Sequence, residues 1–364
     1  MRLNNKVLFI ARRFPPSVGG MERFAYDLSN SLSDSVVLSK ITWGGSNKWL
    51  PFVFVVFFFQ ASWRLLIDRK IKIIHIQDGV QAPLGWLLSK VFRKPFLIVA
   101  HGLDITYEKF YYQRIILPFV RRADMVVSIS VATQNEALKR GVKSNRARVI
   151  TLGTTDDYGD LKPNRAKLSK LTNIDLKNKL LLLTTGRLVK RKGVAWFIEN
   201  VLPELKKTKP EILYLVAGAG SERENIQRAI TNNKQQDSVV LLGRVSDEVR
   251  ALLYRSSDVF IMPNIVVPGD MEGFGIVAHE AANAGLPVIA SNIEGITDAL
   301  HNGKNGILVQ SQDAEAFKRE ILNLLGDENR RKAFGEKARE YTLREYGWEN
   351  ITEQYMQAYE SMVK

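Results

Sequence analysis

The sequence of 364 residues contains no cysteine and only four histidines. The lack of cysteine excludes disulfides, thiolate catalysis and cysteine-based zinc sites, and it fits a reducing compartment. The histidines, at positions 75, 101, 279 and 301, are too few and too widely spaced for a histidine-rich metal centre. No Asp-x-Asp triplet is placed to hold a divalent cation against a diphosphate, so we expect no metal ion.

The sequence also has fewer acidic than basic residues, 38 against 52, which gives a formal net charge of +14. Most of this excess lies in residues 1–160, which carry 23 Lys and Arg against 12 Asp and Glu, a net of +11. Residues 161–364 carry 29 against 26, a net of +3. A basic excess confined to one half indicates an anionic partner, which could be nucleic acid, a membrane surface or a phosphorylated small molecule.

Long hydrophobic runs are scarce as well. We expect no cleavable signal peptide, because the apolar run at 7–11 is too short for one and leads into two arginines. The strongest run, at 50–59, is about half as long as a helix that crosses a bilayer. Two interpretations stay open for it. It is either a core helix or strand beneath a sheet, or a segment in a membrane interface with Trp49 and Trp63 at headgroup level.

Short apolar runs typical of buried strands alternate with helical patterns in both halves of the chain. The predicted strands lie at 7–10, 36–41, 71–76, 95–100, 125–129, 147–151, 180–185, 212–217, 239–242, 259–262, 288–290 and 306–309. This alternation predicts an α/β fold with two doubly wound parallel sheets, each covered by helices on both faces. We expect one domain at 1–160 and a second at 161–345. A polar linker is predicted at 156–178 and a final helix at 346–364.

Two glycines, Gly19 and Gly20, separate the first predicted strand from the first helix. In an open α/β sheet, ligands bind beyond the carboxyl ends of the strands. Glycines at such a strand end let the backbone approach a phosphate, and the following helix offers free N–H groups. The pair lacks the spacing of both the dinucleotide and the P-loop motifs, so a simple turn explains it equally well.

Four basic residues from Arg187 to Lys192 follow the first strand of the second half. Such runs are usually solvated surface charge. Their position at a strand end, between Gly186 and Gly193, instead indicates an anion site in which Arg187 and Lys192 point at phosphate oxygens.

The most informative stretch runs from Glu272 to Glu280. It opens a helix, near Gly275, whose N-terminus can take phosphate through backbone N–H groups. Eight helical positions span about 12 Å, so the two carboxylates could accept hydrogen bonds from a ribose and from a hexose of one ligand. The alternative is a partly exposed helix with ordinary charges, and the small apolar residues around Glu280 argue against it.

His101 follows the fourth predicted strand directly. A lone histidine is more often structural than catalytic, but this strand end faces the cleft that we expect between the two domains. His75 lies within a strand pattern, and we predict that it belongs to the core.

Taken together, these motifs resemble those of the retaining glycosyltransferases of family four, which have the GT-B fold. The resemblance covers essentially the whole chain. It is carried by Glu272 and Glu280 with the continuation to Ser291, and by the segments at 19–23, 101–102, 186–187, 192–193, 218–220 and 302–309. Three features depart from the family pattern. His279 and the long acidic lead-in at 263–271 leave sugar specificity open, and Asp298, where Glu is usual, bears on the sugar or phosphate contacts.

The resemblance implies a role for each motif. Arg187 and Lys192 would bind the diphosphate and stabilise the leaving nucleotide, Glu280 would hold the ribose, and Arg244 and Val245 would receive the base. Glu272, with the backbone of Gly273, Phe274 and Gly275, would hold the donor sugar and a phosphate. Gly19 and Gly20 would close over the diphosphate from the first domain, and His101 would lie near the transferred sugar. The predicted catalytic residues are therefore His101, Arg187, Lys192 and Glu272. The final helix would cross back to the first domain.

The implied activity is retaining transfer of a hexose from a nucleotide diphosphate sugar to a sugar or lipid-linked acceptor, in polysaccharide or glycolipid synthesis. Neither a cofactor nor a metal is expected. In the implied mechanism the donor's β-phosphate takes the acceptor proton, so no side-chain nucleophile is needed. The enzyme would work in the cytoplasm, at the inner face of an anionic membrane that accounts for the basic excess. Two alternatives stay open: an epimerase or phosphorylase on a similar scaffold, and a non-enzymatic basic module that binds nucleic acid.

Overall fold

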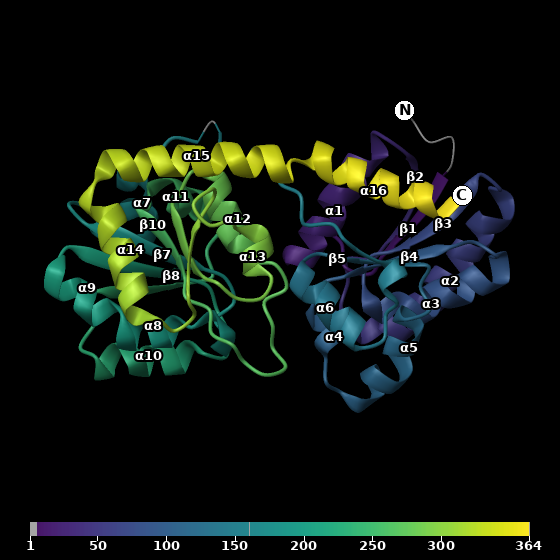
Figure 1. Cartoon of the computed structure of the whole chain (residues 1–364), viewed down its shortest axis with the longest axis horizontal. Coiled ribbons are helices and arrows are strands. Elements are labelled where there is room, and N and C mark those ends of the chain that lie inside the picture. Colours follow the sequence, from purple (N-terminus) through teal and green to yellow (C-terminus); the bar gives the residue numbers. More distant parts are fainter. Residues whose placement is uncertain (1–5, 160, 364) are drawn as a thin grey trace. The chain divides into compact units, whose positions relative to one another are not determined.

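The computed structural model describes residues 6–159 and 161–363 and divides the chain into two compact units (Figure 1). Unit 1 consists of Met1–Gly153 together with Tyr346–Lys364, and unit 2 consists of Thr154–Glu345. Each unit is built on its own six-stranded parallel sheet with helices on both faces. The predicted α/β fold with two Rossmann-like domains is confirmed.

The sheet of unit 1 has the order β2-β1-β3-β4-β5-β6. Its strands are β1 (Lys6–Ala11), β2 (Val37–Thr42), β3 (Ile71–Ile76), β4 (Phe96–Ala100), β5 (Met125–Ser128) and β6 (Ala147–Val149). The central strands are buried on both faces, which explains why they read as continuous apolar runs instead of alternating patterns.

The helices of unit 1 are α1 (Gly20–Ser33), α2 (Leu50–Ile67), α3 (Ala82–Phe92), α4 (Leu103–Thr106), α5 (Leu117–Val120), α6 (Val131–Lys139) and α16 (Trp348–Val363). Short helical turns are η1 (Asn47–Trp49), η2 (Gly79–Gln81), η3 (Tyr112–Ile116) and η4 (Ser144–Arg146). Apolar side chains of α2, α3, α5 and α6 join one core cluster with Leu8 and Ile10 of β1, so these helices cover one face of the sheet. Helix α16 packs on α1 and β3.

The sheet of unit 2 has the order β12-β11-β10-β7-β8-β9. Its strands are β7 (Leu180–Thr185), β8 (Ile212–Ala217), β9 (Val239–Gly243), β10 (Val259–Met262), β11 (Val288–Ser291) and β12 (Ile307–Val309). Its helices are α7 (Arg165–Thr172), α8 (Val194–Asn200), α9 (Leu202–Thr208), α10 (Arg223–Asn232), α11 (Asp247–Ser256), α12 (Ile276–Asn283), α13 (Ile296–Ala299), α14 (Ala314–Gly326) and α15 (Glu328–Tyr346), with the turn η5 (Lys190–Lys192).

Helix α7 lies within the stretch predicted to be a linker. It belongs to unit 2, where Nη2 of Arg165 lies 2.6 Å from Oδ2 of Asp258. Only Leu168 of this helix is buried, so polar contacts and not an apolar stripe hold it in place. The prediction of a linker over this segment is therefore wrong, because a helix held by polar contacts has the composition of a solvated loop.

Strand order places one switch point in each sheet. In unit 1 the chain leaves β1 toward β2 on one side, whereas β3 lies on the other side, and in unit 2 the strands β8 and β10 flank β7 in the same way. Ligands of doubly wound sheets bind in the crevice that such a reversal opens at the carboxyl ends of the strands. The ends of β1 and β3 and the ends of β7 and β10 are therefore where a site is expected.

Two glycines allow close packing beside the switch point of unit 2. A Cβ atom at Gly193 would lie 1.8 Å from the carbonyl oxygen of Pro263, and the φ of Gly193 is +64°. A Cβ atom at Gly218 would lie equally close to the carbonyl oxygen of Gly186. Only glycine lets these backbones meet, so the turns after β7, β8 and β10 pack directly on one another.

His75 joins the sheet of unit 1 to its last helix. Its Nε2 lies 2.9 Å from Oε1 of Gln77, and its Nδ1 lies 2.6 Å from the hydroxyl of Tyr359 in α16. Because the Gln77 oxygen can only accept, Nε2 carries the proton and Nδ1 accepts from the tyrosine. Burial lowers the pKa of His75 to about 3, so it stays neutral. The expectation that His75 belongs to the core is confirmed.

His279, the unusual residue before Glu280, is a second buried neutral histidine. It is 2% exposed and lies edge-on to Phe274, and burial lowers its pKa to about 3. The folded protein therefore does not bind a proton at this residue until the pH approaches that value. In the unfolded chain this histidine binds a proton below pH about 6.5. Protonation therefore favours the unfolded chain, and the free energy of unfolding decreases as the pH falls below that value.

We expect His279→Leu to gain stability relative to the wild type by about 2 kcal/mol when the pH falls from 7.5 to 5, because the variant lacks this protonation penalty. The measurement is urea unfolding of both proteins at pH 7.5, 6 and 5, followed by circular dichroism. A stability difference that stays constant over this range would show that His279 takes up its proton at the same pH in the folded and in the unfolded protein.

Candidate functional site

A buried cluster of charged side chains lies where β7 and β10 end in unit 2. Nζ of Lys192 is 2.5 Å from Oε2 of Glu272, and Nη1 of Arg191 is 3.2 Å from the same oxygen. Nδ2 of Asn264, just after β10, donates to it over 2.9 Å. Three donors on one oxygen hold this carboxylate in a fixed position. Two of the predicted site residues, Lys192 and Glu272, are thus in direct contact.

Two further acidic residues border this cluster. Nε of Arg191 lies 3.1 Å from Oδ1 of Asp270, and Oε2 of Glu294 accepts from the backbone N–H of Glu272 over 2.5 Å. Glu294 has a φ of +48°, which a residue with a side chain rarely adopts. Its carboxylate is therefore held against the backbone of Glu272 at the cost of local strain.

The charges in this cluster depend on one another. Burial alone would raise the pKa of Glu272, but Lys192 and Arg191 outweigh it, and the net effect is a lowered pKa. Burial also lowers the pKa of Lys192, and the Glu272 carboxylate opposes that shift. For Glu294, burial raises the pKa and the neighbouring carboxylate of Glu272 adds to the effect. The cluster is a preformed, desolvated ion pair with a second carboxyl group beside it.

Glu280 lies apart from this cluster, on α12, whereas Glu272 precedes that helix, so the eight positions between them are not all helical, contrary to the prediction from the sequence. It is half-buried, and its Oε2 accepts from the hydroxyl of Tyr254 over 2.9 Å. That hydroxyl also lies 2.8 Å from Oγ1 of Thr185, the last residue of β7. The buried Tyr254 of α11 therefore fixes the orientation of the Glu280 carboxylate through this hydrogen bond.

The other predicted residues of unit 2 surround this edge of the sheet without joining the cluster. Arg187 and Arg244 are exposed at the ends of β7 and β9, and Val245 follows in the loop before α11. Gly273 and Phe274 lead to Gly275, which has a φ of +90° and begins α12. The amide groups at the start of α12 thus lie at the same sheet edge as the Lys192–Glu272 pair, which is the geometry of an anion site.

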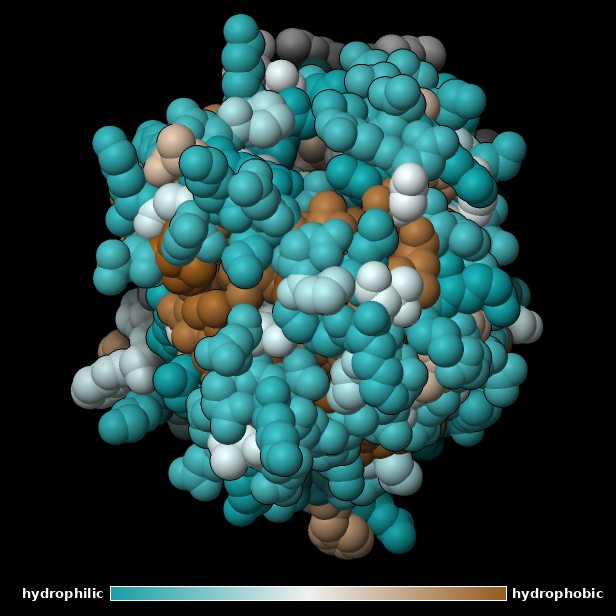
Figure 2. All heavy atoms as spheres, turned by 90° about the vertical axis from the view of Figure 1, so that its left-hand side faces the viewer, coloured by the Kyte–Doolittle hydropathy of each residue, from teal (hydrophilic) through white to brown (hydrophobic). Residues whose placement is uncertain are grey.

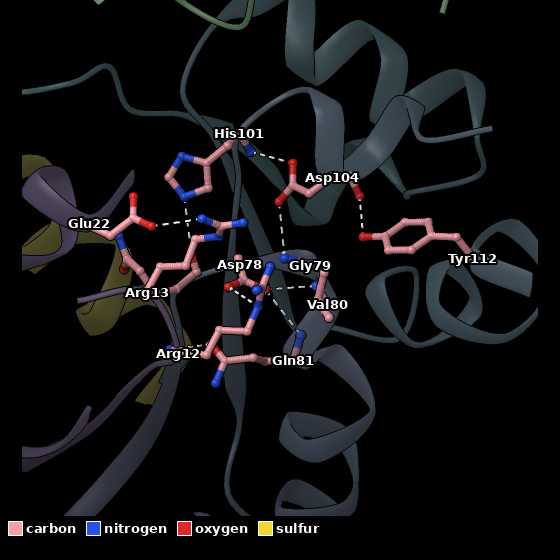
Figure 3. Close-up of polar contacts among 11 residues, drawn as sticks. Arg12, Arg13, Glu22, Asp78, Gly79, Val80, Gln81, His101, Asp104 and Tyr112 are labelled. Atoms are coloured by element: carbon pink, nitrogen blue, oxygen red, sulfur yellow. Dashed lines mark hydrogen bonds and ion pairs between the residues drawn. The ribbon is translucent and has the colours of Figure 1, made fainter. Parts of the chain in front are cut away.

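Unit 1 has its own polar cluster at the ends of β1 and β3 (Figure 3). Nε of Arg12 lies 2.8 Å from Oδ2 of Asp78, and both side chains are buried. Oδ1 of Asp78 also accepts from the backbone N–H groups of Val80 and Gln81 at the start of η2. This ion pair ties the two strands together at their switch point.

His101 lies beside that pair at the end of β4. Its Nε2 donates to the carbonyl oxygen of Gln77 over 2.9 Å, and its backbone N–H donates to Asp104 over 2.7 Å (Figure 3). Asp104 accepts a further bond from the backbone N–H of Gly79, and desolvation raises its pKa. Because Nε2 carries the proton, Nδ1 of His101 is left as a hydrogen-bond acceptor.

The glycine pair lies at the start of α1 in the same unit. Gly19 and Gly20 are both exposed, and a Cβ atom at Gly20 would meet nothing within 4 Å. Close to them, the buried carboxylate of Glu22 lies 2.7 Å from Nη1 of Arg13 (Figure 3). The backbone at Gly20 is therefore open to a ligand, with Arg13 and Glu22 beside it.

Two protein-family models match this chain side by side. The model described as Glycosyltransferase Family 4 matches residues 18–158, and the model described as Glycosyl transferases group 1 matches residues 167–341. The chain belongs to glycosyltransferase family 4.

Several characterised proteins are similar to this family 4 enzyme along most of their length. One is the GDP-mannose-dependent alpha-(1-6)-phosphatidylinositol monomannoside mannosyltransferase of Mycolicibacterium smegmatis, 27% identical, with 78% of this chain and 75% of the relative covered. A monoacylated-substrate mannosyltransferase of the same type from Corynebacterium glutamicum is 24% identical, with 97% of each chain covered. Among solved structures, Anabaena HepE in complex with UDP has a TM-score of 0.78 at 18% identity, over 98% of this chain and all of that chain.

The site of this glycosyltransferase contains residues that the motifs did not single out. Arg191, Asn264 and Glu294 contact Glu272, and Tyr254 contacts Glu280. Arg191 was visible only as one cation in a basic run. Asn264 and Tyr254 carried no signal of their own, because a short polar residue after a strand and an aromatic residue in a helix are common.

Proposed function

We propose that this glycosyltransferase moves a hexose from a nucleotide diphosphate sugar to an acceptor hydroxyl with retention of the anomeric configuration. The observation that supports it best is the buried contact of Lys192 and Arg191 with Glu272 at the switch point of unit 2. A diphosphate that reached this edge would meet Lys192, Arg187 and the amide groups of α12, while the Glu272 carboxylate would face sugar hydroxyls.

The proposed reaction needs no side-chain nucleophile. The acceptor oxygen forms a bond to the anomeric carbon as the bond from that carbon to the phosphate oxygen breaks, and the acceptor proton passes to the departing β-phosphate. Fixed positive charge near that phosphate stabilises the charge that develops on it. Lys192 and Arg187 are the groups proposed for this role, without a metal ion, and Nδ1 of His101 would accept a hydrogen bond from the transferred sugar.

The acceptor and the location of the reaction are proposed from the relatives. Two similar mannosyltransferases have names that specify phosphatidylinositol mannosides as their substrates. We propose a lipid-linked or membrane-proximal acceptor for this chain, bound in unit 1, and reaction in the cytoplasm at the inner face of the membrane. The relatives are described as GDP-mannose-dependent, whereas Anabaena HepE was solved with UDP. The donor base is therefore the first property to measure.

A panel of UDP-, GDP- and ADP-sugars in a thermal-shift assay tests the proposed donor class. One base should raise the melting temperature in proportion to the logarithm of ligand concentration, because the donor binds only the folded protein. If no nucleotide sugar shifts the transition, the enzyme uses another kind of donor. Nuclear magnetic resonance of the first product formed with the active donor then shows whether the anomeric configuration is retained.

Glu280→Ala is expected to reduce that thermal shift strongly at the same ligand concentration, while the protein without ligand melts as before. The half-buried carboxylate is the group proposed to accept the ribose hydroxyls, and its loss removes a charged acceptor worth roughly 1.5–3 kcal/mol. Glu224→Ala, which removes an exposed carboxylate from α10 of the same unit, is the matched control. Equal nucleotide affinity in the two variants would contradict the assignment of Glu280.

Tyr254→Phe is expected to weaken nucleotide binding by about tenfold, because Glu280 loses the hydroxyl that orients it. Tyr214→Phe makes the same change at a buried tyrosine whose hydroxyl bonds to Thr184 instead, away from Glu280. Affinities from isothermal titration should therefore differ between two chemically identical substitutions. If both variants bind equally well, the contact with Glu280 does not contribute to the nucleotide site.

A further inference from the structure

Helix α2 carries two apolar stripes on opposite faces. Val53, Phe57, Ala61 and Leu65 recur every fourth residue and are buried in the core of unit 1. A second stripe consists of Phe52, Val55, Phe59, Trp63 and Leu66, which we call the outer stripe. Its members recur every third or fourth residue and are 53–66% exposed. Since helical positions advance by 100° per residue, the two stripes point in opposite directions.

Exposed apolar side chains of this size are confined almost entirely to unit 1. Of the large hydrophobic residues that are exposed in the described part of the chain, only Leu171 and Val266 lie in unit 2. Figure 2, which faces α9, α10 and α14 of unit 2, shows a mostly hydrophilic surface with brown patches between the polar side chains. A soluble surface normally places polar residues where the outer stripe lies, so this stripe marks an interaction surface.

The outer stripe has apolar neighbours on the adjoining helices. Helix α2 packs against α3, α3 packs against α5, and α5 packs against η3. Leu87 and Val91 of α3 are exposed, as are Phe110, Tyr111 and Ile115 in and before η3. Because α2, α3 and α5 bury their inner sides in one core cluster, they cover the same face of the sheet (Figure 1). Their outer sides therefore form one face of unit 1.

That face carries mostly positive charge, and the one exposed carboxylate in the segment before η3, Glu108, stands next to the exposed Lys109. The sequences of α2, α3, η3 and α5 contain no Asp or Glu. Lys90 of α3 and Arg114 of η3 are exposed, as are Lys48, Arg121 and Arg122 at the adjoining helix ends. In the described part of the chain these five cations form no ion pair. Cationic side chains around an apolar surface suit an anionic lipid headgroup layer.

We propose that this face of unit 1 docks in the plane of an anionic lipid bilayer, with the outer stripe of α2 in the interface. A second copy of the chain fits less well, because two such faces would bring cations against cations. Helix α2 is long and apolar enough to cross a membrane by composition. It connects β2 to β3, however, and both strands pair with β1 in one sheet. If α2 crossed a bilayer, β2 and β3 would lie on opposite sides of it and could not both pair with β1. The helix therefore lies in the plane of the membrane.

This inference rests on the membrane location in the proposed function and deepens it, because it names the surface that docks there whether or not a donor is bound. The test is flotation of the full chain with vesicles of phosphatidylcholine alone and with vesicles that also contain phosphatidylglycerol. We expect binding to the anionic vesicles that weakens at high salt. The double variant Phe59→Glu with Trp63→Glu should lower the bound fraction by roughly tenfold or more, because two interfacial aromatic side chains are lost.

The matched control is the double variant Leu171→Glu with Asn232→Glu, which puts the same two charges on exposed residues of unit 2 and should bind like the wild type. Absence of flotation at low salt would overturn the proposal, and so would equal flotation of the two double variants. Dimerisation in sedimentation that is lost in the α2 variant, without vesicle binding, would show that a second copy covers the face. Donor thermal shifts should be unchanged in both variants, so failure of the donor assignment and failure of membrane docking are distinguishable.

Discussion

Lys192→Met is expected to lower the transfer rate by about 10²–10³-fold, the usual cost of losing one preorganised charge that stabilises a transition state. Nζ of Lys192 is 2.5 Å from Glu272 in a buried setting, so its charge is held in place and is poorly screened by water. The effect should fall on kcat more than on KM, because the charge on the phosphate develops as the sugar leaves. Initial rates with the nucleotide sugar found in the thermal-shift panel provide the measurement.

The neighbouring Lys190→Met is the matched control. Both lysines belong to the same turn, η5, but Lys190 is exposed whereas Lys192 is 7% exposed. Lys190→Met should therefore leave the rate within about twofold of the wild type, because a solvated charge contributes little. A rate loss of the same size in both variants would mean that net positive charge matters and not the position beside Glu272. Circular dichroism melts of both proteins show whether Lys192→Met still folds.

The turn η5 shows which features of the candidate site the sequence could predict and which it could not. The basic run after β7 predicts an anion site, and the structure places this run of residues at the switch point of unit 2. The sequence could not say which cations turn inward. A three-residue turn directs Arg191 and Lys192 into the cluster and leaves Lys190 in solvent. Gly193, which follows this turn, packs directly against the carbonyl oxygen of Pro263. Such a contact joins two turns that lie 70 residues apart, and no local pattern reports it.

For helix α2 the sequence indicated the apolar character but not which face of the helix is buried. The apolar run at 50–59 was read either as core or as a membrane segment, and the structure shows that the helix extends to Ile67 and has one buried face and one exposed face. The buried stripe continues through Ala61 and Leu65, beyond the apolar run that ends at residue 59. Runs of apolar residues hide helical periodicity, because both faces carry the same kind of side chain. Only the positions of β2 and β3 showed which face lies inward.

Asp78→Asn is expected to destabilise unit 1 by about 3–5 kcal/mol, because it leaves the buried guanidinium of Arg12 without its carboxylate. The amide oxygen of asparagine can still accept from the backbone N–H groups of Val80 and Gln81, so the cap of η2 is retained. The measured loss of stability therefore reports on the ion pair alone. The pair joins β1 to β3 beside His101, and its loss should also reduce activity through the position of that residue.

Tryptophan fluorescence can assign this loss to unit 1. Five of the six tryptophans lie there, and Trp196 is the exception in unit 2, so Trp196→Phe gives a background in which urea unfolding reports on unit 1 alone. The control is Asp68→Asn, which breaks a partly exposed pair with Lys6 in the same unit and should not shift the midpoint measurably. Adding Arg12→Met to Asp78→Asn should restore much of the lost stability, since a buried pair replaced on both sides leaves no uncompensated charge. If the double variant is less stable than Asp78→Asn alone, the arginine stabilises unit 1 through contacts other than this carboxylate.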